Sequence, residues 1–260
     1  MAFDPLHTHP NVALSNSNRT ATMGGNINDF YGSRTVLAPP GKAYAEIKVV
    51  SGSVTPDMLI GLTSADPAPH SSGLSSGWHY YQHTGDKQIG SVNAGAFGAA
   101  WDANNDVVGV AYDPAAGKLW FAKNGVWQGS GDPVTGANPA FVGLASGLYL
   151  LIQMYRWQSP AHVLTGNFLT EDFQYTAPDG FRPWDSPYIP SISGNATKSA
   201  GGAVDQVVIR EWTTRALVEI VTPASNGDWT TEINPGQYDI TYFAADCQPI
   251  CHGPYTVTAD

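Results

Sequence analysis

The chain has 260 residues, 42% of them hydrophobic and only 13% charged, and 22 Asp and Glu against 12 Lys and Arg give a net charge of −10. A negative chain without a basic run repels phosphate backbones, which excludes nucleic acid as an expected partner. No segment approaches the roughly 18 apolar residues of a membrane span, and the N-terminal segment lacks the pattern of a secretory signal. We expect two domains that neither insert into a membrane nor use Sec export.

Short segments of apolar or alternating residues, each bounded by Gly, Pro, Asn or Asp, recur along the chain and predict β-strands. In chain order these segments are residues 43–50, 58–62, 107–112, 119–122, 148–155, 207–211, 216–221 and 238–244. No stretch keeps the helical 3.6-residue period for three turns. The sequence therefore predicts an all-β fold.

Two turn signals organise the middle of the chain. Asn124-Gly125 lies between two apolar segments and predicts a type I′ hairpin, whose two central residues both need positive φ. Asp113-Pro114 and the following Ala116-Gly117 predict another reversal just upstream. Together they predict consecutive antiparallel strands in a meander.

A proline-rich stretch divides the chain. Pro183, Pro187 and Pro190 disfavour both helix and central strand, and they favour a stiff extended connector. We place a linker at residues 185–193, between a larger domain of residues 1–184 and a smaller domain of residues 194–260.

Five blocks of the larger domain resemble, in the right order, stretches of the SPRY family in its bacterial and phage form. The blocks are residues 41–46, 60–62, 109–113, 117–125 and 167–168. One departure is Leu169, which stands where a Gly is common in the family. The resemblance implies a two-sheet antiparallel β-sandwich without an active site, which binds its partners through loops at one edge.

The smaller domain resembles the small Ig-like sandwiches of the transthyretin-like or carboxypeptidase-regulatory-like kind, which are add-on modules of secreted and virion proteins. The stretches concerned are residues 207–210, 216–218, 226–230 and 236–242. Trp229, Tyr238, Ile240 and Tyr242 occupy positions that alternate in the manner of a core-facing strand side. About 65 residues bury only a modest core, so we expect stability to come partly from a neighbouring domain or subunit.

The first candidate binding segment is residues 70–85, where small residues are mixed with aromatic ones in the manner of an adaptable recognition loop. We take His79, Tyr81 and His83 as candidate contact residues. The alternative is a strand in which Trp78 and Tyr80 are alternate core residues, and the three candidates then face the other way.

A second candidate segment contains Tyr155, Arg156 and Trp157, whose side chains suit sugar stacking or protein contact. Packing between the two domains explains the same residues equally well.

Cys247, Cys251 and His252 are weak candidates for a metal site, because a structural zinc needs four ligands and the chain has no second cysteine pair. Reduced thiols and a local disulfide are the alternatives. The Asp-rich segments, among them residues 102–106 and Asp113, Asp132 and Asp172, are expected to form turns rather than calcium or acid–base sites. We expect no metal and no cofactor.

The signatures of nucleophilic, phosphate-binding and zinc enzymes are absent from the sequence, so we expect no enzyme. The resemblances favour a structural or binding protein of a phage virion, such as a capsid decoration, head-fibre or tail-fibre subunit, assembled in the host cytoplasm. Its expected partners are other virion proteins, a host surface protein or a glycan, and further copies of itself in an oligomer or lattice. The alternative is a cellular or secreted module that binds a peptide or glycan, and a glycan hydrolase is the least favoured hypothesis.

Overall fold

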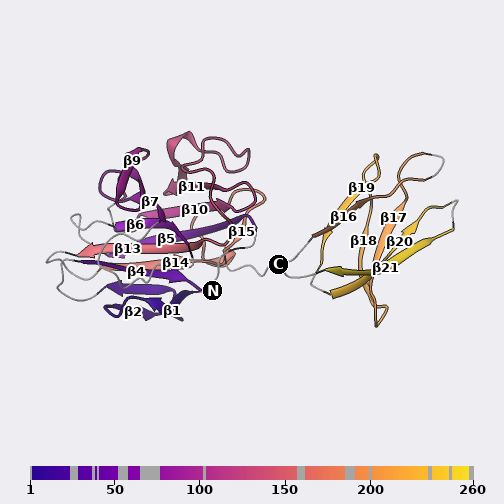
Figure 1. The fold of residues 1–260 in the computed structure, drawn as a ribbon, viewed down its shortest axis with the longest axis horizontal. Coiled ribbons are helices and arrows are strands. Elements are labelled where there is room, and N and C mark those ends of the chain that lie inside the picture. Colours follow the sequence, from indigo (N-terminus) through magenta and orange to yellow (C-terminus); the bar gives the residue numbers. More distant parts are fainter. Residues whose placement is uncertain are drawn as a thin grey trace. The chain divides into compact units, whose positions relative to one another are not determined.

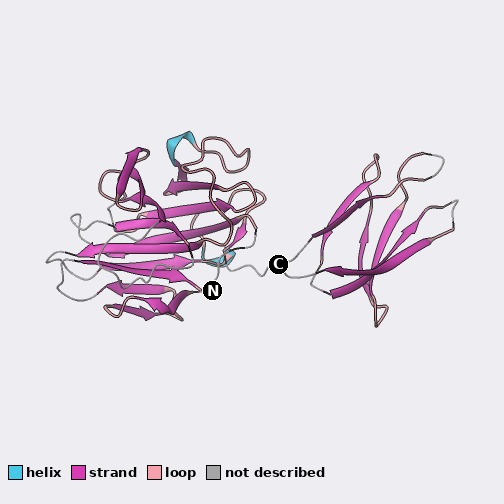
Figure 2. Cartoon of the chain, viewed as in Figure 1, coloured by secondary structure: helices cyan, strands magenta, loops and turns pink. Residues whose placement is uncertain are grey.

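The computed structural model describes residues 2–23, 29–36, 39, 41–51, 58–64, 77–101, 104–156, 162–184, 191–198, 201–233, 236–245 and 248–257. These residues form strands and turns, with two three-residue 3-10 helices, η1 (Gln128–Ser130) and η2 (Thr170–Asp172) (Figures 1 and 2). The chain divides into two compact units, Met1–Ser186 and Pro187–Asp260. The predicted all-β class is confirmed.

The larger unit contains two sheets. The order in the seven-stranded sheet is β1 (Phe3–Thr8), β4 (Asp29–Thr35), β13 (Tyr149–Arg156), β6 (Met58–Thr63), β7 (Gly77–Tyr81), β8 (Asp86–Ile89) and β9 (Val92–Ala96). The order in the eight-stranded sheet is β12 (Val126–Trp127), β11 (Lys118–Lys123), β10 (Val107–Asp113), β5 (Ala43–Ser51), β14 (His162–Asn167), β3 (Thr20–Met23) and β2 (Val12–Ser15), while β15 (Arg182–Pro183) pairs with the start of β5. Every pairing is antiparallel except that of β15.

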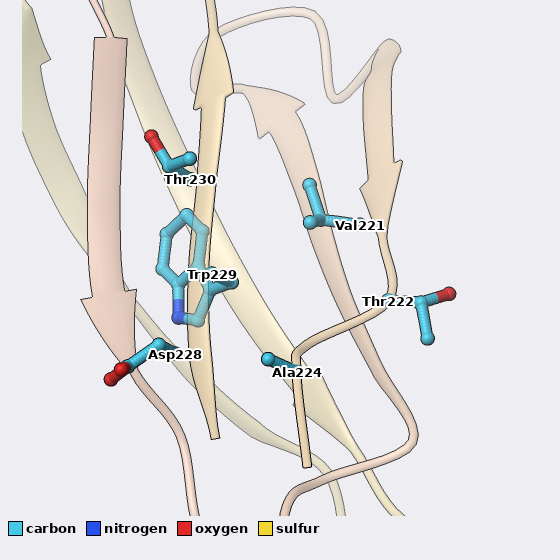
Figure 3. Close-up of a pocket in the computed structure, with 6 residues that line it drawn as sticks. All are labelled: Val221, Thr222, Ala224, Asp228, Trp229 and Thr230. Atoms are coloured by element: carbon cyan, nitrogen blue, oxygen red, sulfur yellow. The ribbon is translucent and has the colours of Figure 1, made fainter. Parts of the chain in front are cut away.

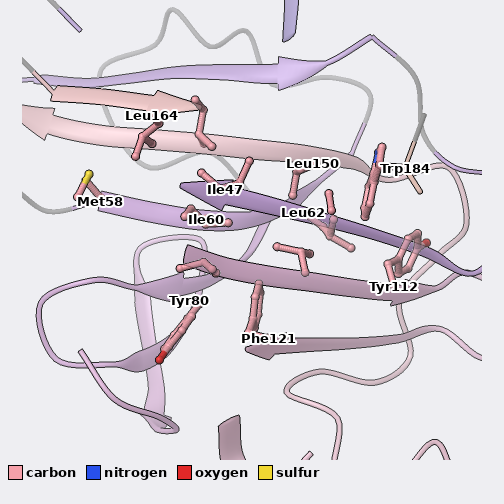
Figure 4. Packing of buried hydrophobic residues seen from close by; sticks show 14 of the residues in the cluster. Ile47, Met58, Ile60, Leu62, Tyr80, Tyr112, Phe121, Leu150, Leu164 and Trp184 are labelled. Atoms are coloured by element: carbon pink, nitrogen blue, oxygen red, sulfur yellow. The ribbon is translucent and has the colours of Figure 1, made fainter. Parts of the chain in front are cut away.

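The core of the larger unit lies between these sheets, because alternate residues of each strand point to one face. Ile60 of β6 and Ile152 of β13 come from the seven-stranded sheet, and Ile47 of β5 and Val110 of β10 from the other. All four are fully buried in one cluster, part of which Figure 4 shows. The predicted two-sheet antiparallel sandwich is confirmed.

Both predicted reversals are present. Asn124 and Gly125 have φ values of 48° and 77°, and they connect β11 to β12. The Asp113 carboxylate accepts a hydrogen bond of 2.9 Å from the Ala116 N–H in the turn between β10 and β11. The strands β10, β11 and β12 are therefore the meander that the turn residues predicted.

The outer face of the eight-stranded sheet is also covered. Tyr44 of β5 and Trp120 of β11 point away from the main core and pack with Phe181 in a second cluster. Trp120 and Phe181 meet edge to face, with ring centroids 6.2 Å apart. The chain that follows β14 therefore returns across this face and closes it.

The smaller unit is a sandwich of unequal sheets. One sheet has two strands, β16 (Ser191–Asn195) and β19 (Asp228–Glu232), and the other has four in the order β18 (Leu217–Val221), β17 (Gln206–Glu211), β20 (Gly236–Phe243) and β21 (Ile250–Val257). Trp229, Tyr238 and Ile240 belong to its buried cluster, and Tyr242 packs against that cluster, as the alternation predicted. Strand β16 begins at Ser191, inside the range that the sequence indicated as linker.

Candidate functional site

His79 lies in strand β7 rather than in an exposed loop, and its side chain is fully buried. Tyr80 belongs to the main core and Trp78 packs against it, so the alternating interpretation of this segment holds and His79 faces the other way. That other face is covered as well, since Leu59, Thr63 and Gln153 on the same face are also buried. His79 therefore offers no exposed atom to a partner, which corrects its assignment as a contact residue.

The burial of His79 changes its acid–base behaviour. Both ring nitrogens are buried without a hydrogen-bond partner among the described residues. Desolvation penalises the charged imidazolium and lowers the pKa of His79 from 6.5 to about 4. The side chain is neutral at physiological pH.

Tyr81 and His83 are more accessible than His79. Tyr81 is half-buried at the end of β7, and His83 is exposed in the turn that follows. Their rings lie 6.5 Å apart in a T-shaped arrangement. These two rings therefore pack against each other at the end of the strand, and their role as contact residues stays a prediction.

The second candidate segment lies at the end of β13. Tyr155 pairs with Phe30 and Arg156 with Asp29 in the backbone register, and Trp157 lies outside the described residues. Strand β6 separates β13 from β7, so the two segments share one sheet about 10 Å apart. The described parts of both candidate segments, residues 77–85 and 155–156, thus belong to or directly follow strands of the same sheet.

Three of the acidic residues that could suggest a hydrolase, Asp106, Asp132 and Asp172, have structural partners. Asp132 accepts hydrogen bonds from Thr135 within its own turn, and these bonds lower its pKa. Asp106 lies 3.3 Å from the Lys123 ammonium, and Asp172 lies 2.5 Å from Arg19. The positive charge of Lys123 beside Asp106 would repel a calcium ion at this position. Asp102 lies outside the described residues.

Glu46 is a buried carboxylate that the sequence did not mark for any role beyond its place in a family-like block. It is fully buried and accepts hydrogen bonds from the backbone N–H groups of Gln174 and Tyr175, at 2.7 and 2.9 Å. The Asn167 amide and the Tyr44 hydroxyl complete its shell, at 3.3 and 3.1 Å. Burial and the nearby Glu46 charge raise the pKa of Tyr44. Glu46 therefore holds the returning chain against the sheet.

The cysteine region offers no metal centre among the described residues. Cys251 is an exposed free cysteine whose Sγ lies 3.6 Å from Oδ1 of the buried Asp239, and Arg215 pairs with the same carboxylate at 2.5 Å. His252 packs its ring against Tyr242. Cys247 lies outside the described residues, and no group of three metal-ligating side chains occurs within them.

The smaller unit contains a hollow of about 440 Å³ at the seam between its two sheets (Figure 3). The residues that line it are Val221, Thr222, Ala224, Asp228, Trp229 and Thr230. Val221 ends β18, and Trp229 stands on β19. The sequence did not predict this hollow, because it lies between β18 and β19, which belong to different sheets and pair with β17 and β16, respectively.

Comparison with known proteins adds information on the fold. No family model and no curated protein match the sequence. Among solved structures, the chain is similar to the SPRY domain of human HERC1, with 15% identity and a TM-score of 0.49 over 64% of this chain and 96% of that one. A human SPRY domain gives 16% identity and a TM-score of 0.47 over 64% and 97%, and stonustoxin gives 16% and 0.42 over 64% and 26%. These likenesses concern the fold and assign no role to a residue.

Neither described helix has the length or apolar character required to cross a membrane.

Proposed function

We propose that the chain is a non-enzymatic binding protein and, more specifically, a structural subunit of a phage virion, such as a capsid decoration, head-fibre or tail-fibre protein. The observation that carries this proposal is the apolar surface on both edge strands of the smaller unit. On β18, Leu217, Val218 and Ile220 are 54%, 40% and 47% exposed. On β21, Ile250 and Tyr255 are 58% and 40% exposed.

Edge strands of this kind favour association. An unpaired edge presents backbone donors and acceptors to any chain that approaches, and monomeric proteins usually protect it with Lys, Pro or a bulge. Strand β18 has Glu219 as its one charged residue and no Pro, but its pairing with β17 shifts register between Ile209 and Arg210. Strand β21 contains Pro254 and also shifts register against β20, so the exposed apolar side chains, rather than a bare backbone edge, carry the argument. An apolar edge on a domain with a modest core is better explained by contact with another subunit than by exposure to water.

The sequence blocks similar to phage-type SPRY proteins support the virion assignment, and the small sandwich then serves as an attachment module of the transthyretin-like kind. The larger unit would present Tyr81 and His83 to a host surface protein or glycan. Parts of both outer faces of its sheets are covered, whereas turns, strand ends and the edge strand β9 are exposed and remain for such a contact.

Co-sedimentation with purified phage particles tests this function. The wild-type chain is expected to sediment with the particles, and the double variant Leu217→Thr, Ile220→Thr to bind at least tenfold more weakly, because both substitutions remove apolar edge surface and keep a strand-forming residue. Val126→Thr is the control, since Val126 is 65% exposed on β12 of the other unit. A wild-type chain that stays monomeric and never sediments with particles would refute the virion role.

A further inference from the structure

Strand β16 has one edge that no described strand covers. All of its residues pair with β19 on the other side. Just beyond β16, the Ala196 N–H bonds the Gly227 carbonyl on the β19 side. Because backbone groups alternate in direction along a strand, those of Ser193 and Asn195 point away from β19, and no described residue bonds them. These groups are positioned to pair with a further strand.

The edge of β16 is also the least protected one among the described strands of the smaller unit. It has no charged residue, no Pro and no register shift. Strands β18 and β21 both shift register, and β21 contains Pro254. The second edge of β19 is closed, because Ala224 and Asn226 bond the backbone carbonyl and N–H of Asp228. An edge without these devices is where a sheet accepts another strand.

The space beside this edge has a largely apolar floor on β21. Tyr242 packs against the buried cluster, and Ile250 lies directly opposite it in the backbone register, so Ile250 faces the core side of its sheet. Tyr255 lies opposite the buried Tyr238 and faces the same way, and His252, between them, packs its ring against Tyr242. Yet Ile250 is 58% and Tyr255 40% exposed. The two-stranded sheet therefore leaves the core side of β21 uncovered.

A second hollow, of about 370 Å³, lies at the end of this floor. The residues that line it are Thr197, Lys198, Val204, Tyr242, Ala244, Gln248 and Ile250. Thr197 lies shortly beyond the end of β16, and Ile250 begins β21, so the hollow joins the free edge to the floor. Its size and mostly uncharged lining suit one bulky apolar side chain.

The charge at the site is already compensated, which selects an uncharged occupant. Lys198 is the charged residue of the lining, and its ammonium lies 3.2 Å from the Asp205 carboxylate. A charged side chain pointing inward would lose its hydration without gaining an opposite charge. A second copy of this chain would bring a net charge of −10, and its described strands already belong to sheets. The site therefore fits an uncharged segment of a different protein.

We propose that the free edge of β16, the core side of β21 and the hollow that joins them bind an extended, uncharged segment of another protein, in which apolar residues alternate with polar ones. The segment would add a third strand beside β16, cover Ile250 and Tyr255, and insert one bulky apolar side chain into the hollow. This inference rests on the proposed virion role, which makes the other protein a neighbour in the particle. It concerns β16 and β21, whereas the variants of the sedimentation test lie on β18.

Isothermal titration calorimetry with the full chain tests the proposal. The probe is a seven-residue blocked peptide that alternates Thr and Val, with Phe in place of the central Val, and the comparison peptides have Lys or Glu at that centre. We expect the Phe peptide to bind at least tenfold more tightly than either, with an affinity that does not change with salt. Equal affinities, no binding of the Phe peptide, or an affinity that falls with salt would overturn the proposal.

Two variants locate the binding. Ser193→Pro removes a donor from the free edge, at a position where an edge strand tolerates proline, and is expected to weaken the Phe peptide at least tenfold, whereas Ser193→Thr should keep the affinity. Ile250→Glu puts a charge on the floor and is expected to weaken it as much, which keeps the test decisive if the proline variant does not fold. Leu217→Glu is the matched control, because Leu217 is 54% exposed on β18, at the other edge of the same sheet. Equal affinities of Ile250→Glu and Leu217→Glu would overturn the proposal.

The two proposals fail separately. Peptide binding without particle sedimentation would refute the virion role alone, and sedimentation without peptide binding would refute the β16 site alone. Dimerisation of the wild-type chain that Ser193→Pro abolishes would identify a second copy as the occupant and overturn the assignment to a different protein.

Discussion

Replacing Glu46 by Gln tests whether the buried carboxylate holds the returning chain on the larger sandwich. One carboxylate oxygen accepts from the Tyr175 N–H and the Tyr44 hydroxyl, and the other from the Gln174 N–H and the Asn167 amide. An amide keeps one acceptor oxygen. Its NH₂ group can donate to the Tyr44 hydroxyl, but it leaves the Tyr175 N–H unpaired.

The expected loss follows from these bonds. A hydrogen bond to a charged group contributes about 1.5–3 kcal/mol, and an unpaired buried donor costs a similar amount, so we expect the free energy of unfolding to fall by about 3 kcal/mol. For a domain of this size, that corresponds to a decrease in Tm of roughly 6–12 °C.

Differential scanning calorimetry of the full chain measures this effect. The transition of the smaller unit serves as an internal reference, because Glu46 lies in the other compact unit. The control is Glu171→Gln, which removes the same charge from an exposed position in η2. Equal transition temperatures for Glu46→Gln and Glu171→Gln would refute the anchoring role.

Two further changes test burial and turn geometry in the larger unit. Because burial holds the pKa of His79 at about 4 while the unfolded chain titrates near 6.5, the unfolded state binds the extra proton first, and stability falls by about 3 kcal/mol between pH 6.5 and 4. We expect His79→Gln to remove that part of the pH dependence in urea unfolding and the exposed His83→Gln to keep it, and identical pH profiles would contradict this. Gly125→Val is expected to cost about 3 kcal/mol, because φ is 77° and the new Cβ would come 2.4 Å from the Tyr175 ring. Gly90→Val, with positive φ but open space, should cost less in the same assay, and equal losses would show that the clash is not important.

The strands and turns of the larger unit were predictable because their signals are local. A period of two residues sets the face to which Ile60 and Ile152 point, and positive φ at Asn124 and Gly125 requires the residue types that the turn contains. Neither signal depends on what the rest of the chain does. The all-β class and the meander therefore follow from the sequence directly.

The burial of His79 was not predictable by the same reasoning. Alternation shows that His79 and Tyr80 point to opposite faces of β7, but it does not show whether the second face is covered. Coverage depends on tertiary contacts, which a single sequence does not reveal. A polar residue between core aromatics was therefore assigned to the surface, where polar residues usually lie.

The seam hollow shows a related limit. Asp228 and Trp229 were recognisable as a turn and a core position, but the hollow depends on the number of strands in each sheet. Two strands cannot cover four, so the smaller sandwich has an open seam between β18 and β19. The larger unit, whose sheets have seven and eight strands, also has exposed apolar residues on its edge strands, namely Leu6 on β1, Val92 on β9 and Val126 on β12. Which strands face each other across a sandwich, and which side chains they leave exposed, therefore depends on tertiary contacts that residue-by-residue alternation does not contain.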